Sequence, residues 1–423
     1  MNNNLHRLSV TLLVSGLSFA ATPALALAPF EQLGKNLFFD TNLSEPNGQS
    51  CSSCHTPSAG FADPDQGIPV SEGVIPGLFS GRNSPTASYA MFSPVFNVDN
   101  NEGIWIGGQF LDGRATGEIT GDPLADQALA PFLNPVEMAN TSKADVVRDA
   151  VNSSYQSLVI SECGNPVFSS EASIDATYMC LAQAIGEFER TWQFAKFNSK
   201  YDAYLKDCIN RGNASDMELD QCAKGIGKNA KKSAKKVFSK KERKGLKLFM
   251  GANNNDGKFD KREGAGCSAC HTADWSDSWS YDKAVITPSW APDGRVPPLF
   301  TDFSYDNLGI PKSQHYLLVN NPVDLGLGPI VSDTQENGKF KVSTIRNVSK
   351  TAPYGHNGFF TTLSSITSFY NTRDSEPWAE AEVPDTMNHT ELGNLGLSSK
   401  QEKQLVAFMK TLTDDYIGDD DDD

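Results

Sequence analysis

The chain has 423 residues and carries 36 Lys and Arg against 52 Asp and Glu, a formal net charge of −16 at pH 7. This length predicts two or three domains. So acidic a chain is a poor nucleic-acid binder, and we expect no partner of that class. Beyond the N-terminus no apolar run is long enough to cross a bilayer, so we expect no membrane span either.

Residues 1–26 have the layout of a secretory signal peptide. One fixed charge, Arg7, precedes an apolar run from Leu8 to Ala21, and Ala24 and Ala26 then form an A-x-A cleavage site. The apolar run is too short to span a bilayer comfortably, which favours cleavage after Ala26 over a membrane anchor. We therefore expect a periplasmic protein.

Two C-x-x-C-H motifs follow, Cys51–His55 with Cys54, and Cys267–His271 with Cys270. This motif is the attachment signature of c-type haem. The two thiols add across the porphyrin vinyl groups, and the adjacent His ligates the iron. A zinc site would need a second Cys pair within tetrahedral reach, and a thiol-redox site would not need the His. The sequence therefore predicts two covalently bound haems.

The other four cysteines are Cys163, Cys180, Cys208 and Cys222. In an exported protein they are expected to oxidise. Their order along the chain favours Cys163–Cys180 and Cys208–Cys222, although four cysteines allow three pairings. We expect these disulfides to be structural.

A G-x-x-L-F segment precedes each haem motif, at Gly34–Phe38 and Gly245–Phe249. A short helix, the haem motif, irregular loops and a closing helix make up a class I cytochrome c domain. Because this order occurs twice, we expect an all-α fold of two class I cytochrome c-like domains, each with one covalent haem, related by duplication. The first closing helix is predicted at 178–192, and Ser399 with Glu402 predicts a capping box for the second.

These features predict five segments. They are a signal peptide (1–26), an N-terminal cytochrome c domain (27–223), a Lys-rich linker (224–240), a C-terminal cytochrome c domain (241–413) and an acidic tail (414–423). Residues 224–247 contain eleven Lys and Arg and one acid, a net charge of +10. They could dock an acidic partner, although a solvated linker is the favoured interpretation. The tail is expected to be solvated and disordered.

Several longer motifs resemble those of the bacterial di-haem cytochrome c peroxidases and their MauG relatives. They are Gly81–Thr86, Asn134–Met138, Phe188–Thr191, Phe340–Val348 and Thr351–Gly358. The resemblance covers nearly all of the mature chain. It implies that the N-terminal haem meets hydrogen peroxide and that the C-terminal haem relays electrons.

The resemblance also implies the residues of the peroxide pocket. Reduction of peroxide needs a group that takes a proton from one oxygen and returns it to the other. The family uses a Glu, with a Gln and a Pro lining the pocket. These correspond to Glu137, Gln127 and Pro131.

A calcium ion lies between the haems in this family. The resemblance implies that Asn83, Thr351 and the carbonyl of Pro353 would hold it, and oxygen donors suit so hard a cation. Residues 252–263 are also similar to an EF-hand loop, but Ala252 stands at the first ligand position, so a second calcium site there is the weaker hypothesis.

Two departures from the family pattern bear on the haem ligands. Ile75 stands where activated peroxidases carry a His that plugs the first haem, so we expect that haem to be open. Tyr370 stands fourteen residues after His356, where Met normally ligates the second iron, and a Tyr ligand there resembles MauG. Met387 or Met409 could replace it only if the loop were rebuilt.

A third departure concerns electron transfer between the haems. The family places a Trp between them, and here that position is Leu111. Trp105 lies six residues earlier, and whether it substitutes stays open.

Three functions are consistent with these observations. In the first, a periplasmic peroxidase draws electrons from a small cytochrome or cupredoxin. In the second, a MauG-type enzyme uses peroxide to oxidise a side chain of a partner protein, and Tyr370 and the missing plug favour this chemistry. The alternative is a non-enzymatic di-haem electron-transfer cytochrome, which would keep both irons six-coordinate.

Overall fold

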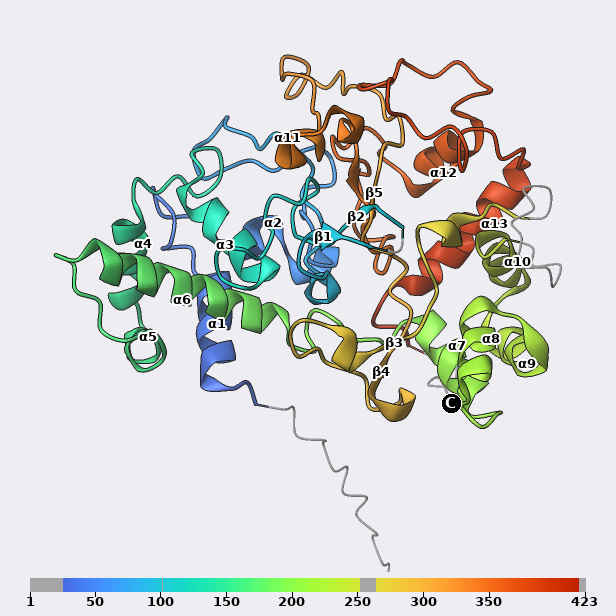
Figure 1. Ribbon diagram of the computed structural model, residues 1–423, viewed down its shortest axis with the longest axis horizontal. Coiled ribbons are helices and arrows are strands. Elements are labelled where there is room, and N and C mark those ends of the chain that lie inside the picture. Colours follow the sequence, from blue (N-terminus) through green and yellow to red (C-terminus); the bar gives the residue numbers. More distant parts are fainter. Residues whose placement is uncertain (1–25, 101, 252–263, 418–423) are drawn as a thin grey trace, which may run out of the picture.

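The computed structural model describes residues 26–100, 102–251 and 264–417 (Figure 1). All but the last residue of the predicted signal peptide lies outside this range, and so does the EF-hand-like segment 252–263. In the part of the chain that the structure describes, no helix is long and apolar enough to cross a membrane.

Helices dominate the regular structure, as the sequence predicts (Figure 1). Their bounds are α1 Pro29–Phe39, α2 Cys51–Cys54, α3 Pro123–Leu133, α4 Lys143–Val151, α5 Gln156–Cys163, α6 Glu171–Glu189, α7 Lys200–Ile209, α8 Asp216–Lys224, α9 Gly227–Val237, α10 Lys240–Phe249, α11 Gly328–Val331, α12 Leu363–Thr372 and α13 Ser399–Met409.

Within the described ranges the strands form three short antiparallel ribbons, each of two strands with two residues. They pair β1 Asn97–Val98 with β2 Trp105–Ile106, β3 Ser276–Asp277 with β4 Arg295–Val296, and β5 Tyr305–Asp306 with β6 Phe340–Lys341.

In the N-terminal half, α1 crosses α6 in close contact. A Cβ on Gly34 would lie 1.8 Å from the carbonyl oxygen of Ala184, so only glycine allows the helices to approach this closely. Phe38 and Phe188 are fully buried at this crossing, with ring centroids 5.5 Å apart. The closing helix predicted at 178–192 runs instead over α6, because Ser170 caps it by accepting from the backbone N–H of Ser173.

The C-terminal half repeats this arrangement with α10 and α13. A Cβ on Gly245 would lie 2.0 Å from the carbonyl oxygen of Gln404. The predicted cap of α13 is wrong by one residue, because the reciprocal box pairs Ser398 with Gln401 instead of Ser399 with Glu402. The two halves therefore share one type of helix crossing.

Helices α7, α8 and α9 pack in the core of the C-terminal half. Tyr201, Tyr204 and Cys222 are buried in the same cluster as Phe249 and Phe408. The first core cluster contains none of these helices, but it does include Val296 and Leu299 from the second half of the chain. The predicted linker 224–240 is the end of α8, the packed helix α9 and the first residue of α10.

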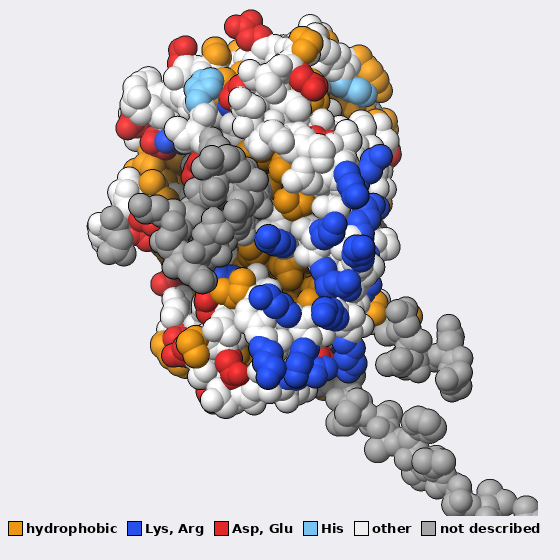
Figure 2. All heavy atoms as spheres, turned by 90° about the vertical axis from the view of Figure 1, so that its right-hand side faces the viewer, with side chains coloured by type: hydrophobic (Ala, Val, Ile, Leu, Met, Phe, Trp, Pro, Cys, Tyr) orange, Lys and Arg blue, Asp and Glu red, His pale blue; other side chains and the backbone are white. Residues whose placement is uncertain are grey.

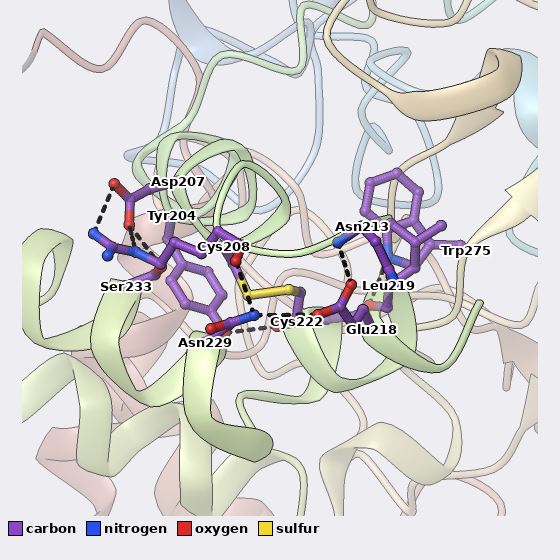
Figure 3. Close-up of a disulfide and its surroundings, with 12 residues drawn as sticks. Tyr204, Asp207, Cys208, Asn213, Glu218, Leu219, Cys222, Asn229, Ser233 and Trp275 are labelled. Carbon is purple, nitrogen blue, oxygen red and sulfur yellow. Dashed lines mark hydrogen bonds and ion pairs between the residues drawn. A yellow bond between two sulfur atoms is a disulfide. The ribbon is translucent and has the colours of Figure 1, made fainter. Parts of the chain in front are cut away.

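Both expected disulfides are present. Cys163–Cys180 joins α5 to α6, and Cys208–Cys222 joins α7 to α8 (Figure 3). They link segments that are already packed together, which agrees with a structural role.

The start of the acidic tail is ordered, contrary to the prediction of a solvated segment. Asp414 is 6% exposed and accepts hydrogen bonds from the hydroxyl of Tyr89 and the amide of Asn347. Asp415 forms an ion pair with Lys196. Specific partners for these carboxylates override the disorder expected from composition.

Candidate active site with two haem cavities

The first haem motif lines a cavity of about 310 Å³. Cys51 and Cys54 bound the single turn α2, so both thiols lie on one side of the chain, and His55 follows directly. The Nδ1 atom of His55 lies 3.2 Å from the carbonyl oxygen of Phe61. That contact orients the ring and leaves Nε2 free to bind a metal.

The second haem motif lines a separate cavity of about 290 Å³. Cys267, Cys270 and His271 contribute to its wall, and Nδ1 of His271 lies 3.0 Å from the carbonyl oxygen of Phe300. Burial lowers the pKa of both His271 and His55, so each imidazole is held in the neutral form that a metal ligand requires.

The chemistry of these donors fits covalent haem c. Among the described residues the four motif cysteines are the ones left out of disulfides, and each pair lies beside a partly buried His with a lowered pKa. Cys51, Cys54 and His55 would hold one haem, and the three corresponding residues at 267–271 the other. The bound irons would supply the redox chemistry.

The three residues expected at the peroxide site all line the first cavity. Gln127 and Pro131 come from α3, and Glu137 from the turn that follows it. Burial raises the pKa of Glu137, and the nearby Arg114 opposes that rise. Ile75, at the position of the plugging His, is 39% exposed and does not contribute to the cavity wall.

The sequence analysis missed one acid in the first cavity. Glu189, at the end of α6, is 5% exposed and lines the cavity together with Glu137. Burial raises the pKa of Glu189 to about 8, with Arg190 opposing the rise. The sequence signal that could have identified Glu189 is its place in the Phe188–Thr191 motif, directly after Phe188 of the helix crossing.

In the second cavity Tyr370 projects from α12. Its hydroxyl has no hydrogen-bond partner among the described residues, which leaves it available to a ligand in the cavity. Burial raises the pKa of this phenol. Met409 also lines the cavity, whereas Met387 packs beside Gly309.

His356 lines the second cavity but is engaged elsewhere. Its Nε2 lies 3.0 Å from a carboxylate oxygen of Glu382, and its ring stacks on Phe340 with centroids 3.9 Å apart. These two contacts occupy Nε2 and one face of the His356 ring.

The residues expected to bind calcium all contribute to the cavity walls. Asn83 lines both cavities, and Thr351 and Pro353 line the second. The Asn83 amide nitrogen donates to the carbonyl of Pro69 over 3.1 Å, and no described hydrogen bond uses its side-chain oxygen. An amide oxygen, a hydroxyl and a backbone carbonyl are oxygen donors of the kind that calcium prefers.

One residue at the family's Trp position lies between the two haem cavities. Leu111 lines both cavities. Trp105 stacks on Phe96 with centroids 4.9 Å apart and lines neither cavity. Trp105 therefore does not occupy the place that the family gives to its Trp.

Two haem attachment sites in one helical chain define a di-haem c-type cytochrome, and comparison with known proteins narrows the class. Residues 29–209 match the di-haem cytochrome c peroxidase family. Methylamine utilization protein MauG of Paracoccus denitrificans is 32% identical over 410 residues, covering 90% of this chain and 88% of that protein. Cytochrome c551 peroxidase of Pseudomonas aeruginosa is 26% identical, covering 90% and 78%.

Comparison with solved structures supports the same family. The di-haem peroxidase BthA of Burkholderia thailandensis superposes with a TM-score of 0.67 at 27% identity, covering 91% of this chain and 86% of that one. The chain thus belongs to the di-haem cytochrome c peroxidase family and is a peroxidase with two covalent haem c sites.

Proposed function

We propose that this protein is a periplasmic, peroxide-consuming enzyme whose first haem is open to peroxide and whose second haem carries Tyr370 as an iron ligand. It oxidises a redox protein or a side chain of a partner protein. The observation that carries the proposal is the free hydroxyl of Tyr370 in the second cavity. Tyr370 stands at the position where a Met thioether normally ligates the second iron in this family. A signal-like N-terminus and two disulfides support export.

The first cavity supports the peroxide step. Its wall contains one His, His55, and its acid is Glu137. A carboxylate oxygen of Glu137 takes a proton from one oxygen of H2O2 and returns it to the other, which leaves as water. Partial burial favours the protonated form in the second half of this cycle, while Arg114 keeps the ionised form accessible.

Calcium binding forms part of the proposal. Asn83, Thr351 and the carbonyl of Pro353 would hold the ion in the wall between the cavities. Its role there is structural, because it would join a loop of the N-terminal half to a loop of the C-terminal half.

We also infer that the two halves arose by duplication. The support is the repeated glycine crossing, in which Gly34 and Gly245 each face a carbonyl of the closing helix. A buried Phe follows four residues later in both helices, Phe188 after Ala184 and Phe408 after Gln404.

The alternative to an open first haem is a six-coordinate first haem, as in an electron-transfer cytochrome, and one observation favours it. Met138 lines the first cavity beside Glu137 and could serve as a sixth ligand to the first iron. A carrier would then have two low-spin haems.

A resting-state EPR spectrum of the haem-loaded protein separates the two functions. The proposed enzyme gives one high-spin and one low-spin ferric haem, and it reacts with peroxide without prior reduction. Two low-spin signals, or a strict need for a reducing step, would contradict an open first haem.

A further inference from the structure

The outward faces of α9 and α10 form a basic surface on an otherwise acidic protein. Figure 2 shows Lys and Arg side chains gathered in a band over this side of the molecule. Residues 224–247 carry +10, whereas the whole chain carries −16. Glu242 is the single acid in the segment, and it is bound to Lys200.

The lysines of α9 point away from the core. Lys228, Lys231, Lys232 and Lys235 are exposed, and none forms an ion pair among the described residues. They lie three and four residues apart, so their like charges face one another, an arrangement that destabilises a helix by about 0.2–0.5 kcal/mol per pair.

The start of α9 also lacks the usual stabilising features. Its N-cap is Ile226, without a side-chain hydrogen bond, and the first turn holds no acid to complement the helix dipole. A helix that lacks these features must be stabilised by contacts with other elements of the fold.

That support comes from the inner face of α9 (Figure 3). Asn229 donates to a carboxylate oxygen of Glu218 over 3.2 Å, and Ser233 donates to Asp207 over 2.6 Å. Glu218 and Asp207 belong to the α7–α8 pair that the Cys208–Cys222 disulfide joins. Contacts on the inner face thus hold α9, including an ion pair of Lys236 with Asp207, while the four lysines named above stay without an ion pair among the described residues.

Helix α10 continues the basic surface and places it over the second haem site. Lys240, Lys241, Lys244 and Lys247 are exposed without an ion pair among the described residues. On the opposite face of the same helix, Phe249 lines the second cavity. One helix, about 10 Å in diameter, thus separates the basic surface from that cavity.

We propose that the outward face of α9 and α10 docks an acidic redox protein that delivers electrons to the second haem. An extended anionic surface such as a membrane fits less well, because the remaining acidic surface of the molecule would repel it. A compact acidic protein can contact the lysines alone.

This proposal rests on the proposed peroxidase function for its electron balance. Each H2O2 takes two electrons and two protons to give two waters. A one-electron donor is oxidised once per encounter, so two encounters complete a turnover. The docking itself does not depend on turnover and can be measured without peroxide.

The test measures binding of the haem-loaded protein to plastocyanin, a small acidic cupredoxin, and to mitochondrial cytochrome c, a basic protein of similar size. We expect plastocyanin to bind more tightly, with an affinity that falls steeply as NaCl rises from about 10 mM to about 0.5 M. The variant Lys231→Gln/Lys235→Gln/Lys244→Gln should bind plastocyanin about tenfold more weakly at low salt.

A matched variant controls for net charge. Lys35→Gln/Lys143→Gln/Lys283→Gln removes the same charge from other parts of the surface and should change binding less than about twofold. Equal losses in both variants, no plastocyanin binding, or binding only to phosphatidylglycerol vesicles would each overturn the proposal. Binding without peroxide-driven oxidation of plastocyanin would leave the docking surface intact and count against the proposed function instead.

Discussion

Arg82 of the N-terminal half makes a two-point ion pair with Asp324 of the C-terminal half. Its Nε and Nη2 atoms lie 2.6 and 2.7 Å from the two carboxylate oxygens, and its Nη1 contacts Asp112. Arg82 lines the first cavity and Asp324 the second. The guanidinium therefore connects the walls of both sites, in a geometry that lysine could not reproduce.

Asp324→Asn should destabilise the protein by about 1.5–3 kcal/mol, because a charge-assisted bidentate contact between the halves is lost. Chemical denaturation measures this loss. Asp175→Asn, which breaks an exposed ion pair with Lys143, is the control and should cost under about 1 kcal/mol. Equal effects would show that Arg82 does not couple the halves.

Glu137→Gln should slow the reaction with peroxide by about 10²–10⁴-fold while peroxide still binds, because the amide cannot carry the proton. Stopped-flow spectroscopy of the haem bands gives both quantities. Glu118→Gln changes an exposed acid outside the cavity wall and should react at the wild-type rate. An unchanged rate in Glu137→Gln would remove this residue from the mechanism.

The sequence predicted the parts of the site that depend on local spacing. The two C-x-x-C-H motifs and the G-x-x-L-F helices lie where their patterns indicate, since each needs only neighbouring residues. Family motifs placed Glu137 and Tyr370 at the two cavities.

Features that depend on distant contacts were not predictable in this way. The lysine-rich sequence of α9 is typical of a solvated linker, but hydrogen bonds to Asp207 and Glu218 attach this helix to α7 and α8. Asp414 is acidic and near the terminus, yet it is buried by partners more than sixty residues away, Asn347 and Tyr89. Composition does not encode such partners.

The buried acid Glu189 predicts a pH-dependent stability. Its pKa is raised from 4.5 to about 8 by burial, so the folded protein holds a proton that the unfolded chain has released. Stability should therefore fall as pH rises from about 4.5 to about 8, because the unfolded state binds fewer protons in that window. Thermal unfolding of the haem-loaded protein at about pH 5 and about pH 8 measures the slope.

Glu189→Gln should flatten this slope, since glutamine does not titrate. Glu162→Gln alters an exposed acid on α5 and should keep the wild-type slope. If both variants depend on pH as the wild type does, Glu189 is ionised in the folded protein and its cavity is wetter than its burial indicates.

Tyr370 decides between the two enzymatic versions of the proposed function. Phenolate is an anionic, hard donor that favours ferric iron, whereas thioether is a neutral, soft donor that favours ferrous iron. Tyr370→Met should therefore raise the reduction potential of the second haem and make the protein a better acceptor of electrons from an ordinary cytochrome c.

Tyr354→Phe is the matched control. This residue lines the same cavity, but its hydroxyl donates to the carbonyl of Val348, so its loss should leave the potential unchanged. Redox titration of both variants is the measurement. A second-haem potential identical to wild type in Tyr370→Met would mean that Tyr370 is not bound to the iron, and the MauG-like version of the function would then lose its main support.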